Sequence, residues 1–167
     1  MMIDLLIVTG GSKGIGRNIV TNSSSYAKKI LAIGSSDSIN GISCKENNIF
    51  TIKKDLSKIE NNLDELNDFL VEHKPVSVGI VMCASSIGSH GGILEADLSE
   101  WDYLYKLNVL GNLSVLKSVL MHIKKTSLIR AVFFAGGGAA YGYPEFSGYS
   151  LSKVAVVRAV ENIGIEL

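Results

Sequence analysis

A glycine-rich turn that directly follows the first apolar segment constrains the fold of this chain more than any other feature. The segment at 5–8 is apolar throughout, and the eight residues after it follow the pattern T-G-x-x-x-G-x-G. These residues are Thr9, Gly10, Gly11, Ser12, Lys13, Gly14, Ile15 and Gly16. With the Thr content and the 17 Gly of this chain, a random sequence is expected to contain this pattern roughly 0.004 times.

Glycines at a strand-to-helix turn let the backbone approach a ligand closely and leave N–H groups free to bind a pyrophosphate. We therefore assign all eight residues to a dinucleotide site. The alternative is a turn that serves only the close packing of a strand on a helix.

Short apolar runs recur with helical stretches between them, at 5–8, 30–33, 49–52, 78–84 and 131–135. None alternates strictly between apolar and polar residues, which is typical of strands covered by helices on both faces. The pattern predicts an α/β fold with a doubly wound, Rossmann-like parallel sheet of about five strands in three αβα layers. A length of 167 residues suits one core, so we expect a single dinucleotide-binding domain over 1–167.

Two segments carry apolar residues at helical spacing. In 99–125, the start Ser99-Glu100-Trp101-Asp102 resembles a capping box, and leucines then recur every three or four residues. We expect one long, half-buried helix there. The other segment, which Pro75 ends, presents an apolar helical face made of Leu63, Leu66, Phe69 and Leu70.

Charge and hydropathy exclude several kinds of partner. The 16 basic residues balance 16 acidic ones, so no general positive field attracts nucleic acid or acidic membranes. The start of the chain lacks a basic leader and no apolar run is long enough to span a bilayer, so we expect a cytoplasmic protein. Cys44 and Cys83 lack the spacing of metal ligands, so we expect reduced thiols and no metal site.

Tyr149 and Lys153 are four residues apart, so in a helix both side chains project from one face. Composition alone predicts roughly half a Tyr-x-x-x-Lys match by chance, but here the pair follows the last predicted strand. A phenol beside a cation acts as an acid toward a carbonyl or as a base toward an alcohol, because the cation favours the phenolate. The alternative is a surface pair on an amphipathic helix.

The glycine turn and the segment 144–153, read Pro-Glu-Phe-Ser-Gly-Tyr-Ser-Leu-Ser-Lys, together resemble the single-domain branch of the short-chain dehydrogenase/reductase family. The resemblance implies hydride transfer between a nicotinamide dinucleotide and a small carbonyl or alcohol substrate, with Tyr149 as the acid or base. It implies that Lys153 lowers the pKa of Tyr149 and binds the nicotinamide ribose, and that Asn108 supports a water that links Lys153 to solvent. Relatives commonly associate through the helices at 99–125 and 149–167, so we expect a homo-oligomer.

The residues after the second predicted strand bear on the choice of cofactor. Relatives that prefer NAD place an Asp there for the ribose 2′-hydroxyl, but 33–36 contains none and the first acid is Asp37. Lys13 is a cation where the resemblance places the 2′-phosphate of NADP, and Ser35 or Ser36 can donate hydrogen bonds to it. We therefore expect NADP rather than NAD.

The resemblance assigns three further residues to the cofactor site. Asp55 corresponds to an aspartate that contacts the adenine ring, and Leu56 and Ala84 lie beside the same cofactor. Asp55 also suits the N-cap of a helix, and the two roles are compatible.

The sequence departs from the family pattern at 134–138. Relatives carry a Ser about thirteen residues before the tyrosine to bond the substrate oxygen, but here the stretch is Phe-Ala-Gly-Gly-Gly. Loss of one such donor typically costs on the order of 10² to 10³ in rate. The candidate replacements are the backbone N–H groups of 136–138, Ser147 and Tyr141.

Relatives are also longer, and the resemblance implies that the last two strands, with the loop that shapes the substrate pocket, are missing. The fifth predicted strand then lies at an apolar sheet edge, for which we expect self-association or low stability. Two functions remain open at this point. One is an NADP-dependent oxidoreductase; the other is a non-catalytic dinucleotide-binding module, either a truncated remnant or a structural subunit.

Overall fold

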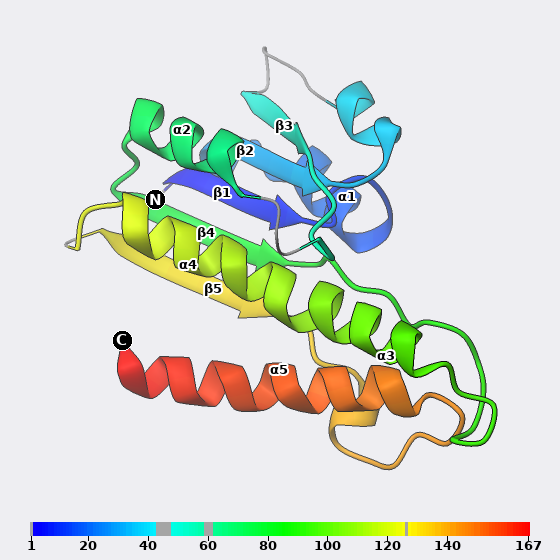
Figure 1. Cartoon of the computed structure of the whole chain (residues 1–167). Helices are drawn as coiled ribbons and strands as arrows, with labels where there is room; N and C mark the ends of the chain where they lie inside the picture. Colours follow the sequence, from blue (N-terminus) through cyan, green and yellow to red (C-terminus); the bar gives the residue numbers. More distant parts are fainter. Residues whose placement is uncertain (1, 43–47, 59–61, 126) are drawn as a thin grey trace.

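The computed structural model describes residues 2–42, 48–58, 62–125 and 127–167, and its centre is a parallel sheet (Figure 1). The strands are β1 (Ile3–Thr9), β2 (Ala27–Gly34), β3 (Ile49–Lys53), β4 (Ser77–Met82) and β5 (Leu128–Phe133). Their order across the sheet is β3-β2-β1-β4-β5, and every neighbouring pair is parallel. The prediction of five parallel strands is confirmed. The strand order reverses between β1 and β4, and α/β folds bind ligands at the carboxyl ends of such strands.

Helices cover both faces of the sheet and give the three predicted αβα layers (Figure 1). The α-helices are α1 (Gly14–Asn22), α2 (Asp64–His73), α3 (Leu98–Tyr105), α4 (Asn112–His122) and α5 (Ser147–Glu166). α1 packs on one face of the sheet, and α2 and α4 pack on the other. Alternate residues of β1 point to opposite faces, so Leu5 and Ile7 join one apolar cluster while Leu6 and Val8 join the other. Burial on both sides explains the continuous apolar run in the sequence.

The helix that we predicted at 99–125 begins and ends at other residues in the structure, and a π-helical turn interrupts it. A π-helical turn, η2 (Lys106–Gly111), joins α3 to α4. The N-cap is Asp97 rather than Ser99, because the Asp97 carboxylate accepts a 2.8 Å hydrogen bond from the Ser99 N–H. The segment ends at His122, since the backbone of Ile123 is extended. The capping box predicted at Ser99 is therefore wrong, whereas the long helical segment is confirmed.

β5 is the exposed edge of the sheet, as predicted. It pairs only with β4 among the described strands, and its ladder begins at Ser77 with Leu128, three residues before the predicted start. Val132 is 53% exposed and Leu128 is 50% exposed. The strand begins early because Ile129 contacts the same apolar cluster as α4, which extends the pairing toward the amino end.

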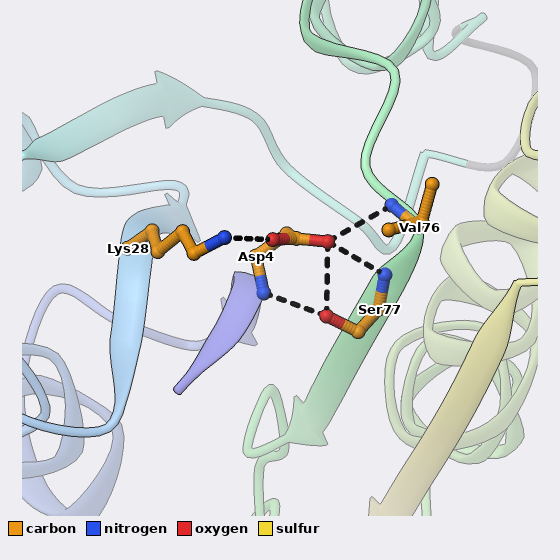
Figure 2. Close-up of polar contacts among 4 residues, drawn as sticks. All are labelled: Asp4, Lys28, Val76 and Ser77. Atoms are coloured by element: carbon orange, nitrogen blue, oxygen red, sulfur yellow. Dashed lines mark hydrogen bonds and ion pairs between the residues drawn. The ribbon is translucent and has the colours of Figure 1, made fainter. Parts of the chain in front are cut away.

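Asp4 holds the amino ends of three strands together, at the opposite end of the sheet from the glycine turn (Figure 2). One carboxylate oxygen accepts hydrogen bonds from the Val76 N–H (3.1 Å), the Ser77 N–H (3.0 Å) and the Ser77 hydroxyl (3.0 Å). The other oxygen lies 2.7 Å from the Nζ of Lys28, on β2. Lys28, assisted by the Ser77 and Val76 hydrogen bonds, lowers the pKa of Asp4 to about 2.

Candidate active site

Close contacts require glycine at positions 10 and 16 of the turn, and a positive φ favours it at position 14. Gly10 has φ +66°, and a Cβ there would lie 2.8 Å from the backbone nitrogen of Ala84. A Cβ on Gly16 would lie 2.4 Å from the carbonyl oxygen of Gly10. Gly14 has φ +57° and begins α1. A side chain at these positions would open the turn, so the backbone is brought close to the end of β4 and α1 begins directly behind it.

A single cavity of about 560 Å³ extends from this turn along the carboxyl ends of the strands to α5. Most of the residues that we assigned to the cofactor line it: Gly10, Ser12, Lys13, Gly14, Ile15, Gly16, Ser35, Asp55, Leu56, Ala84, Tyr149 and Lys153. Ser36 lines it as well. The cavity has further walls that we did not predict, among them Lys54, Ser86, Tyr103, Leu107 and Phe134.

Thr9 and Gly11, which we assigned to the cofactor site, do not line the cavity. Thr9 is fully buried; its hydroxyl donates to the side-chain oxygen of Asn112 (2.7 Å) and accepts from the Ala84 N–H (3.0 Å). The Asn112 amide also donates to the Ala84 carbonyl (2.8 Å). Gly11 packs on Ala32, whose Cβ would lie 2.9 Å from an added Cβ. These residues therefore support the cavity wall from its buried side.

Asn108 is buried behind the same wall and also does not line the cavity. Its amide donates to the Ser86 carbonyl and to the Ser152 hydroxyl, both at 2.9 Å, and its oxygen accepts from the Ser86 N–H at 2.8 Å. Ser152 in turn donates to the carbonyl of Tyr149 (2.6 Å). Asn108 lies in the π-helical turn η2, an irregularity that is frequent at functional sites. It therefore joins the loop after β4 to α5.

Sequence reasoning missed Asn112, Ser86 and Ser152, which complete this network. The spacing of Asn108 and Asn112 carried a usable signal, since two asparagines four apart on a mostly apolar helix share one face. The serines had no such signal, because their partners lie on other elements. Asn108 and Ser152, for example, are 44 residues apart in the chain.

Tyr149 and Lys153 both face the cavity from α5, as predicted. The Lys153 Nζ donates to the carbonyl of Phe134 (2.9 Å) and lies 5.6 Å from the centre of the Tyr149 ring. Burial raises the pKa of Tyr149, and the neighbouring Tyr143 raises it further. Burial also lowers the pKa of Lys153, against a smaller opposing effect of Cys83. The expected lowering of the Tyr149 pKa is thus wrong for the protein's own groups, because the ammonium lies over the ring and bonds a carbonyl instead of the phenol oxygen.

Gly136 lies thirteen residues before Tyr149, where the resemblance implies a serine, and the Tyr149 hydroxyl fills the space beside it. A Cβ on Gly136 would lie 2.5 Å from the Tyr149 oxygen. None of the three candidate replacements lines the cavity: Ser147 is the first residue of α5, Tyr141 is 78% exposed, and the cavity wall does not include Gly136 to Gly138. Gly136 is the N-cap of a short 3₁₀ turn, η3 (Gly137–Ala139), which packs next to α5.

The structure bears on one of the two roles considered for Asp55, that of a helix N-cap. Its carboxylate accepts from the N–H (3.0 Å) and the hydroxyl (2.7 Å) of Ser57, two residues along the chain. The following helix, α2, begins only at Asp64. The N-cap role is therefore wrong, and Asp55 closes a local turn at the cavity wall.

Neither a cluster of metal-binding side chains nor a membrane-spanning helix is found in the part of the chain that the structure describes. No group of three or more His, Cys, Asp or Glu is arranged there for a metal ion. No described helix has the length and apolar character needed to cross a bilayer. Cys83 is a free thiol in the cavity wall, and burial raises its pKa to about 11. Cys44 lies outside the described residues.

Known proteins resemble this chain in sequence and in fold. An uncharacterized oxidoreductase of Schizosaccharomyces pombe is 24% identical over 97% of this chain and 65% of its own length. The 3-ketodihydrosphingosine reductase of Mus musculus is 26% identical over 97% of this chain and 51% of its own length. A short-chain dehydrogenase/reductase of Burkholderia vietnamiensis superimposes with a TM-score of 0.84 at 18% identity, over 96% of this chain and 78% of that one.

This chain thus spans about half to two thirds of the length of these two sequence relatives. The sequence model of one family, described as short chain dehydrogenase, matches residues 4–167. That match covers nearly every residue from β1 to the end of α5, including the glycine turn and the Tyr149–Lys153 pair. This protein is therefore a member of the short chain dehydrogenase family.

Proposed function

We propose that this chain is the cofactor-binding and catalytic part of an NADP-dependent oxidoreductase that transfers hydride between NADP(H) and a carbonyl or alcohol. The observation that carries the proposal is one cavity that joins the glycine turn to Tyr149 and Lys153. A binding turn without a reactive group, or a reactive pair without a binding turn, would not support this function.

The residues present fit a nicotinamide dinucleotide. Gly14 begins α1 with nothing within 4 Å of an added Cβ, so a ligand has open access to the amino end of this helix. The hydroxyl of Ser12 is buried in the cavity wall without a hydrogen-bond partner in the described chain, and a ligand oxygen would satisfy it. In this proposal the turn holds the pyrophosphate, Asp55 and Leu56 lie at the adenine end, and Ala84 and Lys153 lie toward the nicotinamide. The bound dinucleotide supplies or accepts the hydride.

The protonation of Tyr149 favours the direction of reduction. A phenol already keeps its proton at neutral pH, and the raised pKa of Tyr149 reinforces this, so the group is suited to act as an acid. We propose that it donates this proton to the carbonyl oxygen of a substrate, while the Lys153 ammonium, held by Phe134, orients the ring. The name of the mouse relative refers to reduction of a ketone, which agrees with this direction.

The test of this proposal is Tyr149→Phe, which removes the phenol hydroxyl and keeps the aromatic ring. We expect turnover of carbonyl substrates to fall by about 10² to 10⁴, the usual contribution of a general acid, while the Kd for NADPH stays unchanged. The matched control is Tyr141→Phe, which changes the same group at an exposed position outside the cavity. Equal turnover in wild type and Tyr149→Phe would remove Tyr149 from the chemistry.

A second candidate function is a dinucleotide-binding module without catalysis. The observation that favours it is Gly136, since no serine hydroxyl stands there and the Tyr149 oxygen fills its space. A missing donor of this kind costs about 10² to 10³ in rate. This alternative predicts NADPH binding without reduction of any member of a panel of ketones and aldehydes, whereas measurable NADPH oxidation that Tyr149→Phe abolishes would exclude it.

We also propose that copies of the chain associate through the helical segments at 99–125 and 149–167. The outer surface of α5 carries exposed apolar residues, including Leu151, Val154 and Val157. Such a surface is more favourable when a partner covers it. Light scattering of wild type and of Val154→Lys tests this, because the charged variant should shift the assembly toward the monomer.

A further inference from the structure

The part of the cavity next to the end of β2 carries two cations that come from different elements. Lys13 stands just before α1, and Lys54 follows β3. The Lys54 N–H donates to the carbonyl of Gly34 (2.9 Å), which places its backbone beside the last residue of β2. In the described chain neither ammonium has an ion-pair or hydrogen-bond partner. Lys13 is exposed and Lys54 is half-buried, and two unpaired cations that line one cavity favour a ligand with negative charge.

A buried hydroxyl points to the same place. Ser12 is only 5% exposed, and its Oγ has no hydrogen-bond partner among the described groups. This oxygen lies against Gly34, where an added Cβ would be 2.0 Å away. A buried donor without a partner is unfavourable, and such groups mark positions that a ligand atom completes. Ser12, Gly34 and Lys54 all line this end of the cavity.

Asp37, the first acidic residue after β2, does not line the cavity. Asp37 pairs with Lys53, the residue directly before Lys54, and neither of this pair lines the cavity. Consecutive residues at the end of a strand point to opposite sides. Lys53 is therefore occupied by Asp37, whereas Lys54 faces the cavity, so the wall next to β2 keeps its positive charge.

We infer that Lys54 determines cofactor specificity by binding, together with Lys13 and the Ser12 hydroxyl, a phosphate monoester on the adenosine ribose. The inference rests on the proposed function, since it assigns to one residue the preference for NADP over NAD. Sequence reasoning placed Lys13, Ser35 and Ser36 at this phosphate and gave Lys54 no role. Two ammonium groups from separate elements bind a doubly charged phosphate more tightly than a ribose hydroxyl, because only the phosphate forms charge-assisted hydrogen bonds with both.

Titration calorimetry of the whole chain with adenosine 2′,5′-bisphosphate and adenosine 5′-monophosphate tests the inference without any need for turnover. Wild type should prefer the bisphosphate. Lys54→Met should weaken binding of the bisphosphate by about 10- to 100-fold, the value of one hydrogen bond to a charged group. Binding of the monophosphate should stay unchanged. The matched control is Lys29→Met on β2, a cation near the amino end of the strand that does not line this cavity.

The outcomes separate this inference from the proposed function. If wild type prefers the bisphosphate and Lys54→Met keeps that preference, Lys54 is not the determinant, while the proposed function stands. If wild type binds both nucleotides equally, the choice of NADP is wrong and the inference falls with it. If Lys54→Met weakens both nucleotides equally, or lowers the melting temperature, its role is structural and the inference is overturned. Lys54→Arg, which keeps the charge, should retain the preference.

Discussion

Removal of the Asp4 carboxylate is expected to destabilise the fold in a pH-dependent way. Asp4 joins the amino ends of β1, β2 and β4 through Lys28, Val76 and Ser77 (Figure 2). Its pKa falls from 3.8 to about 2 in the folded chain, which corresponds to about 2.4 kcal/mol at 1.36 kcal/mol per unit. The Lys28 side chain is 63% exposed, and solvent screens exposed pairs, so we reduce this figure to about 1 to 2 kcal/mol.

The sign of this pH dependence follows from which state, folded or unfolded, binds the proton of Asp4 more weakly. The folded chain binds a proton at Asp4 less readily than the unfolded chain does, so ionisation of Asp4 favours folding. This stabilisation is complete above about pH 4 and is lost as the pH falls from about 4 to about 2. Asp4→Asn should therefore be about 1 to 2 kcal/mol less stable than wild type at neutral pH, with the difference shrinking toward zero near pH 2.

Urea unfolding followed by circular dichroism, at several values of pH between about 7 and 2, measures this difference. The matched control is Asp68→Asn, which makes the same change on the exposed side of α2. The control should differ from wild type by less than about 0.5 kcal/mol at every pH. A difference between Asp4→Asn and wild type that stays constant over the whole range would refute the assignment of the stabilisation to the ionised carboxylate.

Two further substitutions test the turn and the buried network. Gly16→Ala places a Cβ 2.4 Å from the Gly10 carbonyl, a backbone atom, so we expect a loss of about 1 to 3 kcal/mol and weaker NADPH binding. Gly142→Ala, with nothing within 4 Å of its Cβ, should have neither effect in the same melts and titrations. Asn108→Ala leaves the Ser86 N–H and the Ser86 carbonyl without their partner, so we expect a loss of about 2 to 4 kcal/mol by urea unfolding. A loss below about 1 kcal/mol would mean that water replaces these bonds.

Much of the fold was predictable because its signals are local. The apolar runs marked all five strands, since burial on both faces of a parallel sheet demands continuous apolar residues. The glycine turn marked the passage from β1 to α1, because only glycine allows the approach of Gly10 to the end of β4. The ends of elements were less predictable. Asp97 displaced Ser99 as the N-cap, since either residue type suits that position and the packing of α3 selects one.

The candidate site was predictable as a list of residues but not as an arrangement. Spacing placed Tyr149 and Lys153 on one helical face, and both line the cavity. Spacing did not reveal that the Lys153 ammonium bonds the Phe134 carbonyl, or that burial and Tyr143 raise the pKa of Tyr149. It also did not reveal that the Tyr149 hydroxyl lies where a serine side chain at position 136 would stand.

The sequence by itself determined the fold class, the glycine turn and the spacing of Tyr149 and Lys153, since each is read from residues within a few positions of one another. Only the tertiary structure decided which of those residues face the cavity. Thr9 belongs to the glycine motif, yet it turns inward to Asn112, 103 residues away. Lys54 belongs to no motif, yet the pairing of β3 with β2 brings it to the cavity wall. Such placements depend on contacts between segments that are distant in the sequence, and a local sequence pattern does not predict those contacts.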